Sequence, residues 1–393
     1  MRSIAILLAA AIALFTVHTA TALDQKLYGL NYTPRKGQDY MPLKKRCKNA
    51  TEIDADLAKI HALTDRLRIY SLTDCNTAAL VIPAAQRANL SIWVGLWVGP
   101  NNTVYAEEKA AFTSLVAKGL VNNNTLGVHV ASEAIYRKDI NVSQAITNYN
   151  EIKQILHDAD VYIPVTVTDI ADTYIAYPQL TKAVDIISAN SFPFWENVVP
   201  EVASQSMYNR MYPLMLAAKK YNKKILISET GWATNGSSAG ASVASSQAGV
   251  TWLNDFYFLA KTVSWDYYWY SSFDQPWRHV EGDNTTADVE NYFGLYFNNG
   301  TLKPEFATLN FTQRVKIVTK MPVPKQSTAA PVAVATAAPS PVVTDASASP
   351  APVVPSVPVV TASVASNGTN GTEPHKKSKI LSILEALIRG WMF

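Results

Sequence analysis

The sequence has little of what several common kinds of functional site require. It contains only two cysteines in 393 residues, its formal net charge is +3, and 17% of its residues are charged. No cluster of His, Cys, Asp and Glu residues has metal-ligand spacing, and no glycine-rich phosphate loop is present. The small net charge provides no field that would recruit nucleic acid. We therefore expect a neutral substrate, no cofactor and no nucleic-acid partner.

Apolar runs long enough to cross a membrane are also scarce. Residues 1–22, MRSIAILLAAAIALFTVHTATA, place Arg2 ahead of a short apolar segment and end on Ala-Thr-Ala, the small-residue pattern of a cleavage site. This pattern predicts a signal peptide, whereas the alternative, an N-terminal membrane anchor, needs a longer run. Export predicts a secreted, extracellular or cell-surface protein.

N-glycosylation sequons are frequent, as expected of a secreted glycoprotein. They begin at Asn31, Asn49, Asn89, Asn101, Asn123, Asn141, Asn235, Asn284, Asn299, Asn310, Asn367 and Asn370. Asn31 lies in an expected buried strand, so we exclude it from the glycosylated set. In an oxidising compartment Cys47 and Cys75 can form one disulfide bond, and two buried thiols are the alternative.

Between Leu23 and Val318, short apolar runs alternate with helix-like stretches, which is typical of repeated βα units around a parallel sheet. The candidate strands are KLYGLNY, DRLRIYS, LSIWVGLWVG, TLGVHVASE, VYIPVTVTD, AVDIISANS, KKILISE and WDYYWYSSFD. Eight such strands predict an α/β fold, a closed (β/α)8 TIM barrel over residues 23–318. Between the first two strands, residues 51–54 (TEID) resemble a capping box that begins a helix.

The composition changes near residue 319. Residues 319–375 are rich in Pro, Ser, Thr and Ala with almost no charge, which predicts a disordered, O-glycosylated stalk. Residues 376–393 place basic residues ahead of an apolar stretch. This tail fits a lipid-anchor signal, an interfacial amphipathic helix or an inert end. It is therefore the segment through which we expect any association with a membrane or cell wall.

Two candidate strands end in a glutamate, one at Glu133 and the other at Glu229. In a β/α barrel the active site collects at the C-terminal ends of the strands, so both carboxylates are expected at the mouth. Strand alternation predicts two sets of residues that share a face, namely His129, Ala131 and Glu133, and Ile225, Ile227 and Glu229. Paired carboxylates are what glycoside hydrolysis requires, and a separation of roughly 5–5.5 Å would favour a retaining mechanism. A lone glutamate would more simply be a surface residue.

The segments LYGLNYTPRKG, RIYSLTDC, GVHVASEAIYR, ISETGWAT, and SSFDQPWR followed by ENYFGLYFNNGTLKP occur in this order between Leu27 and Pro304. Together they resemble the family 17 glycoside hydrolases, the β-1,3-glucanases, and are most similar to the fungal and oomycete members. The resemblance implies a retaining (β/α)8-barrel enzyme with Glu133 as general acid/base and Glu229 as nucleophile. In one departure, the family often has Asn directly before the acid/base, whereas this chain has Ser132, whose hydroxyl can still donate to a sugar 2-hydroxyl.

Aromatic side chains near strand ends can pack against the apolar faces of sugar rings. Candidates for the walls of the cleft are Tyr32, Tyr70, Phe192, Trp232 and Trp277, with core packing as the alternative for each. Trp232 has further support because it follows Glu229 by three residues within a segment that carries the resemblance. Asn190 and Asp274 are candidates to bind sugar hydroxyls, and Asp274 could instead hold a neighbouring loop. His129 lies deeper along its strand, where we expect it to be packed.

The predicted function is a secreted retaining glycosidase that cleaves β-1,3-glucan, as polysaccharide or oligosaccharide, through a covalent intermediate. A glucan transglycosylase is an alternative with the same chemistry, because sugar rather than water then intercepts the intermediate. A non-catalytic glucan-binding wall protein is the third reading, and the presence of both glutamates argues against it. Endo or exo action stays open, and we expect a monomer.

Overall fold

Eight parallel strands close into a barrel in chain order, and β8 pairs back onto β1. The strands are β1 (Leu30–Asn31), β2 (Arg66–Arg68), β3 (Ser91–Leu96), β4 (Gly127–Ser132), β5 (Val165–Ile170), β6 (Ile187–Asn190), β7 (Ile225–Thr230) and β8 (Asp266–Trp269). This arrangement confirms the predicted (β/α)8 TIM barrel. The computed structural model describes residues 23–278 and 288–319, so the expected signal peptide, the stalk beyond Thr319 and the tail lie outside the described residues.

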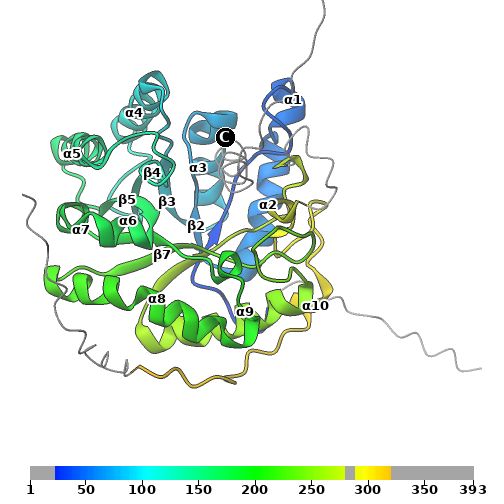
Figure 1. The fold of residues 1–393 in the computed structure, drawn as a ribbon. Coiled ribbons are helices and arrows are strands. Elements are labelled where there is room, and N and C mark those ends of the chain that lie inside the picture. Colours follow the sequence, from blue (N-terminus) through cyan, green and yellow to red (C-terminus); the bar gives the residue numbers. More distant parts are fainter. Residues whose placement is uncertain (1–22, 279–287, 320–393) are drawn as a thin grey trace, which may run out of the picture. The chain divides into compact units, whose positions relative to one another are not determined.

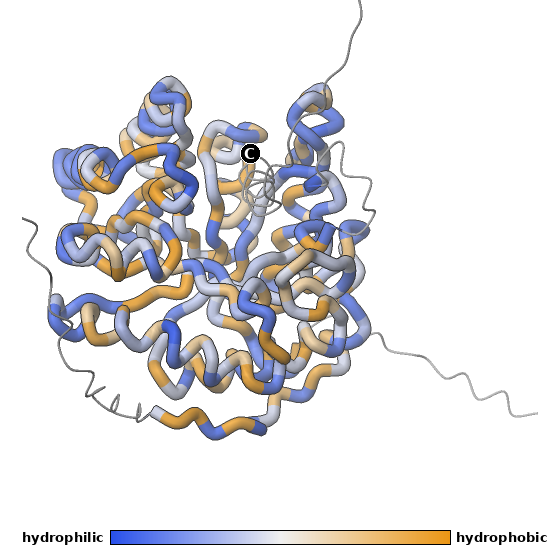
Figure 2. Tube along the Cα trace, in the orientation of Figure 1, coloured by the Kyte–Doolittle hydropathy of each residue, from blue (hydrophilic) through white to orange (hydrophobic). Residues whose placement is uncertain are grey.

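Helices wrap around the barrel (Figure 1). They are α1 (Leu43–Arg46), α2 (Ala50–Leu63), α3 (Thr77–Arg87), α4 (Asn102–Ala117), α5 (Val142–Asp158), α6 (Ala171–Ala176), α7 (Pro178–Ala183), α8 (Pro200–Tyr221), α9 (Ser246–Val263) and α10 (Pro304–Ala307). Short 3-10 helices are η1 (Asp74–Asn76), η2 (Pro193–Glu196), η3 (Pro276–Arg278) and η4 (Val289–Tyr292). Hydrophobic and hydrophilic residues alternate along the long helices (Figure 2). Within residues 23–278 and 288–319, no helix is long and apolar enough to span a membrane.

Helix α2 shows how the local sequence fixes an element. Ile53, Leu57 and Ile60 recur at helical spacing and are buried, as predicted. The capping box, however, lies two residues earlier than the expected TEID segment. The side chain of Asn49 accepts from the N–H of Glu52 at 3.0 Å, and the Glu52 carboxylate accepts from the N–H of Asn49 at 2.8 Å. An Asn at the N-cap satisfies the free N–H groups of the first turn, so the helix begins at Ala50.

The interior of the barrel changes from apolar to polar toward the C-terminal ends of the strands. Trp93 on β3, Leu226 on β7 and Tyr268 on β8 form one buried cluster, which must cross the interior because β3 and β7 are not neighbours. Gly29 makes room for it, because an added Cβ there would lie 2.3 Å from the Tyr268 ring. Further along the strands the interior holds buried polar side chains, Arg68 and His129 among them. The active-site candidates therefore lie next to a layer of apolar side chains that fills the barrel interior.

The exposure of the sequons fits the expectation made for Asn31. Asn31 is fully buried, which agrees with leaving it out of the expected glycosylated set. The exposed sequon residues are Asn49, Asn89, Asn101, Asn123, Asn141, Asn235, Asn299 and Asn310. Asn284, Asn367 and Asn370 lie outside the described residues.

Candidate active site

Glu133 follows a β-bulge at the end of β4. The pairing of β4 with β5 skips a residue between Val130 and Ser132, and Ala131 has φ 73° and Glu133 φ 59°. The alternation predicted for this strand is therefore broken. His129 and Ser132, three residues apart, both contact side chains across the barrel interior. Glu133 reaches the site because the bulge redirects the chain.

Asn190, at the end of β6, holds the Glu133 carboxyl group. Its Nδ2 donates to Oε1 of Glu133 at 2.6 Å, while its Oδ1 accepts from the hydroxyl of Ser228 at 2.7 Å. The Ser228 contact orients the amide so that its NH2 group faces Glu133. Burial, and next the negative charge of Glu229, raise the pKa of Glu133 to about 8. A carboxyl group in this state keeps its proton at neutral pH, as a general acid must.

Glu229 points into the barrel for a similar reason. Leu226 belongs to the interior floor, whereas Ile227 packs in the outer core between the barrel and the helices. Simple alternation from Ile227 would thus have sent Glu229 outward, contrary to the predicted shared inward face. Irregular register between Ile227 and Thr230 turns it inward instead. Bulges therefore bring both carboxylates to the site, where strand periodicity alone would not.

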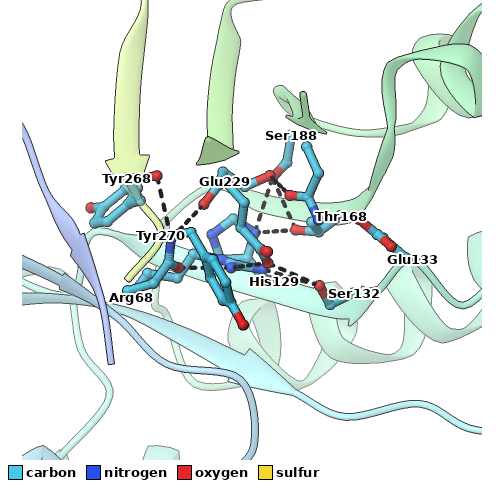
Figure 3. A network of polar contacts seen from close by, with 12 residues as sticks. Arg68, His129, Ser132, Glu133, Thr168, Ser188, Glu229, Tyr268 and Tyr270 are labelled. Carbon is cyan, nitrogen blue, oxygen red and sulfur yellow. Dashed lines mark hydrogen bonds and ion pairs between the residues drawn. The ribbon is translucent and has the colours of Figure 1, made fainter. Parts of the chain in front are cut away.

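Arg68, on β2, is the cation that pairs with Glu229. Its Nη1 lies 2.7 Å from Oε1 of Glu229 and 2.8 Å from Oδ1 of Asn31, and both side chains of the ion pair are almost fully buried. Ser132 adds its hydroxyl at 3.4 Å from the same carboxylate oxygen. Figure 3 shows Arg68, Ser132 and Glu229 in one network with Glu133 beside it. The sequence signal was available, because an arginine flanked by buried apolar residues in the strand DRLRIYS requires a buried partner.

His129 lies inside the barrel, as expected. Its Nδ1 is 2.6 Å from the hydroxyl of Thr168 and 3.2 Å from that of Ser188, and its ring packs on Trp93 with centroids 4.6 Å apart. Burial, and next the charge of Arg68, hold the pKa of His129 well below its usual value. The ring is therefore a neutral packed histidine that supports the network from below.

Some of the predicted substrate-binding residues do lie around the carboxylates. Burial, followed by the charge of Glu229, raises the pKa of Tyr70, whose ring also packs under the Arg68 guanidinium at 4.6 Å. Phe192, two residues beyond Asn190, packs edge-on against Tyr270 and Phe293. Tyr70 thus lies beside the charged pair, and Phe192 belongs to an aromatic cluster next to Asn190.

Trp232 is not a wall residue, contrary to the prediction. It is fully buried, its Nε1 donates to the carbonyl of Val243 at 3.0 Å, and it packs against Phe194 and Trp252. Its motif position reflects core packing behind β7. A side chain with no exposed surface cannot stack on a sugar.

Tyr32, Asp274 and Trp277 lie on the β1 and β8 side of the barrel and are engaged there. The hydroxyl of Tyr32 donates to Asp56 on α2 at 2.9 Å. Asp274 pairs with Lys303 at 2.7 Å and accepts from the N–H of Gly294 at 2.9 Å, which is the loop-holding alternative named for it. The guanidinium carbon of Arg35 lies over the ring of Trp277, 5.7 Å from the ring centroid. The predicted hydroxyl-binding role of Asp274 therefore finds no support in its contacts.

A third carboxylate, which sequence reasoning missed, lies near Glu229. Glu290 on η4 is 3.7 Å from the guanidinium of Arg278 on η3, and Arg278 also donates to the hydroxyl of Tyr270. Burial raises the pKa of Glu290, the Arg278 charge lowers it, and the charge of Glu229 raises it further. The segments SSFDQPWR and ENYFGLYF contain these two opposite charges, which were the available signal.

The predicted disulfide bond is present. Cys47 and Cys75 are bridged, with Cα atoms 5.3 Å apart. The bond joins the end of α1 to η1, and therefore the loop after β1 to the loop after β2. Among the described residues, no group of three or more His, Cys, Asp and Glu side chains is arranged to hold a metal ion.

Comparison with known proteins identifies a sequence family that matches this chain. The sequence family described as the BtgE/BtgC glycoside hydrolase domain matches residues 29–294. The Saccharomyces cerevisiae glucan 1,3-beta-glucosidase is 25% identical over 317 residues, which are 77% of this chain and 97% of that protein. An Aspergillus niger protein named, provisionally, as a glucan endo-1,3-beta-glucosidase is 30% identical over 298 residues, or 70% of this chain. The match spans 42% of the length of that Aspergillus relative.

Solved structures share the fold. A glycoside hydrolase family 17 beta-1,3-glucanosyltransferase from Rhizomucor miehei superposes with a TM-score of 0.61 at 26% identity, covering 71% of this chain and 96% of that chain. An active-site mutant of a Rhizomucor miehei beta-1,3-glucanosyltransferase in complex with laminaritriose gives a TM-score of 0.62 at 24% identity, covering 73% and 98%.

Proposed function

This chain belongs to the BtgE/BtgC glycoside hydrolase family, and from that premise we propose that it cleaves β-1,3-glucan with retention, through a covalent glycosyl-enzyme intermediate. The observation that carries the proposal is the contrast between the two carboxyl groups. Glu133 is buried with its pKa raised to about 8, whereas Glu229 lies against the guanidinium of Arg68 at 2.7 Å. Two carboxyl groups in unlike environments are suited to the roles of acid and nucleophile.

In the proposed reaction, an oxygen of Glu229 attacks the anomeric carbon and forms an ester while the bond to the leaving sugar breaks. Glu133 gives its proton to the departing oxygen, so the leaving group departs as a neutral hydroxyl. In the second half, Glu133, now a carboxylate, removes a proton from water, and the resulting hydroxide displaces Glu229. Asn190 keeps Glu133 oriented in both halves, and Arg68 keeps Glu229 in place.

Transglycosylation is a second candidate because the structural likeness to a beta-1,3-glucanosyltransferase reaches 26% identity over most of that chain. Here a sugar hydroxyl, rather than water, loses its proton to Glu133. Incubation with laminari-oligosaccharides and separation of the products by size distinguishes the two outcomes. Shorter products indicate hydrolysis, longer ones indicate transfer, and an unchanged substrate would contradict both in favour of glucan binding alone.

Azide rescue tests the two catalytic assignments. With an aryl β-glucoside that has a good leaving group, Glu133→Ala should accumulate the intermediate, and azide should release it as the β-glucosyl azide. Glu229→Gly should give the α-azide, because azide then enters from the position of the missing nucleophile. Glu201→Ala, on the exposed side of α8, is the control and should retain wild-type turnover. Exchanged anomers would reverse the assignments, and full activity in both variants would contradict the mechanism.

We further propose that the protein acts outside the cell, with residues 23–318 as its catalytic domain and the following segment as a stalk. The disulfide bond and the exposed sequons of the barrel support export. Glycosidase digestion of the secreted protein, followed by mass spectrometry, should show glycans on exposed sequons and none on Asn31.

A further inference from the structure

The turn that follows Glu133 presents an aromatic side chain to solvent. Tyr136 is 55% exposed and lies three residues after Glu133. The N–H of Arg137 donates to the carbonyl of Glu133 at 2.9 Å, which closes residues 133–137 into a single helical turn. The phenol ring therefore stands on the same turn as the proposed general acid. Neither the carboxylate network nor the proposed reaction uses it.

This turn is held firmly from behind. One oxygen of Asp169, a fully buried residue on β5, accepts from the N–H groups of Ile135 at 3.0 Å and Tyr136 at 3.3 Å. Its other oxygen accepts from the hydroxyl of Thr173 at 2.7 Å. A buried carboxylate with this many donors fixes the backbone that it binds. The ring of Tyr136 is thus exposed, and the backbone at its attachment point is fixed by hydrogen bonds.

Arg137 holds the same turn from the opposite side. Its guanidinium donates to the carbonyl of Ser132, lies 3.3 Å from that of Val98, and stacks on the ring of Trp97 at 4.7 Å. The backbone of this turn therefore has little conformational freedom left to lose when a ligand packs on the Tyr136 ring.

The role proposed for Glu133 determines which sugar unit of the substrate would contact the Tyr136 ring. Glu133 must reach the glycosidic oxygen, so the leaving sugar lies beside Glu133 on the side away from Glu229. Burial, and next the charges of Glu133, Asp169 and Asp172, raise the pKa of Tyr136. These residues belong to β4, β5 and α6, whereas Glu229 and its partner Arg68 lie on β7 and β2. Tyr136 is therefore on the leaving-group side.

We propose that Tyr136, on the turn held by Asp169 and Arg137, is the binding platform for the leaving-group sugar. This is the glucosyl unit whose oxygen receives the proton of Glu133. The same platform would receive an acceptor sugar in transglycosylation, because that reaction reverses the first step. The ligand class is a neutral β-linked glucose ring, whose apolar face packs on the phenol. This inference rests on the proposed function.

Two substrates that share a donor sugar but differ in the leaving group test the proposal. In laminaribiosyl fluoride the leaving group is too small to reach Tyr136, whereas in laminaritetraose it is a sugar. Tyr136→Ala should lower kcat/KM for laminaritetraose about tenfold and leave that for the fluoride unchanged, because only the sugar loses a packing partner. Tyr136→Phe keeps the ring and should restore the wild-type value.

Tyr162→Ala is the matched control. Tyr162 is 69% exposed and lies between α5 and β5, at the opposite end of the barrel, so both substrates should be unaffected. A Tyr136→Ala variant that loses both substrates equally, or neither, would overturn the proposal. A wild-type protein that converts neither substrate would instead contradict the proposed function, so the two failures are distinguishable.

Discussion

At the scale of single residues, the site depends on keeping one carboxyl group protonated beside another that is charged. Burial and the charge of Glu229 raise the pKa of Glu133 to about 8. The alkaline limb of kcat/KM should therefore fall as pH rises through this value, since ionised Glu133 cannot protonate the leaving sugar. A pH–rate profile on laminarin checks this expectation. An activity that fell already near pH 5 would contradict it.

The same pKa shift has a consequence for stability. Between about pH 4, where a glutamate in the unfolded chain ionises, and the raised native pKa, the folded protein holds a proton that the unfolded chain releases. Raising the pH over this window therefore favours unfolding, and the loss is complete once Glu133 ionises. The Tm of the wild type should fall relative to that of Glu133→Gln between pH 5 and pH 9. Parallel Tm curves would show that Glu133 does not titrate in this way.

Arg68 should matter for stability as well as for activity. In Arg68→Met the carboxylate of Glu229, which is fully buried, loses its cation. Removing one partner of a buried pair typically costs about 3–5 kcal/mol of unfolding free energy. Urea unfolding should show this loss, and Arg68→Met/Glu229→Gln should recover much of it because the uncompensated charge is gone. A double variant no more stable than the single one would argue that Arg68 acts mainly by packing.

The positions of both carboxylates at strand ends could be predicted from the sequence, but their orientation could not. Glu133 and Glu229 each end an apolar run, and that signal is local. Period-two alternation carries no information about bulges, and the structure contains one beside each glutamate. The prediction that Trp232 lines the cleft was wrong for another reason. A motif position does not say whether a side chain faces solvent or the core. Arg68 was missed although its charge within a buried strand was visible.

At the scale of elements, the barrel follows from the repeated apolar runs, but the ends of the elements depend on single contacts. The first expected strand, KLYGLNY, is longer than β1, which is only Leu30–Asn31. Pairing in a barrel stops where the neighbouring strand diverges, and one strand's composition does not report that point. The capping residue of α2 was likewise displaced, since Asn49 is as good an N-cap as the expected Thr51.

The loops after β1 and β2 form a unit that the disulfide bond fixes. Cys47 and Cys75 are 28 residues apart, and closing a loop of this length in the unfolded chain corresponds to about 3–4 kcal/mol in the chain-entropy account. Cys47→Ser/Cys75→Ser should lower the Tm accordingly. Activity on soluble glucan at 25 °C should persist, because Arg35 still pairs with Asp74 at 2.8 Å between the same loops. An unchanged Tm would show that the bond adds no stability.

At the scale of the whole molecule, the barrel is completed by a segment with no regular secondary structure. Residues 308–319 run along the outer side of α9 and α8, as the golden trace at the bottom of Figure 1 shows. The side-chain amide of Asn254 makes two hydrogen bonds with the backbone of Thr312, at 2.9 and 2.8 Å. That of Gln205 does the same with Val318, at 3.2 and 2.8 Å. These contacts tie residues 308–319 to the barrel helices.

This segment should therefore be required for stability, whereas the chain beyond it should not. Ending the protein at Thr319 should leave both the Tm and the activity on soluble laminarin unchanged. Ending it at Ala307 removes Arg314 from the buried carboxylate of Asp255, a contact of 3.0 Å, and takes Phe311 off the ring of Tyr257. Leaving that carboxylate without its partner and exposing the apolar surface of α9 should cost about 3 kcal/mol, which lowers the Tm of a protein this large by roughly 5–10 °C. The comparison by calorimetry is internally controlled, because both variants lack the same stalk and tail. Equal Tm values for the two truncations would place the end of the catalytic domain at α10, and a loss of folding in the Thr319 variant would extend it into the segment that composition predicts to be disordered.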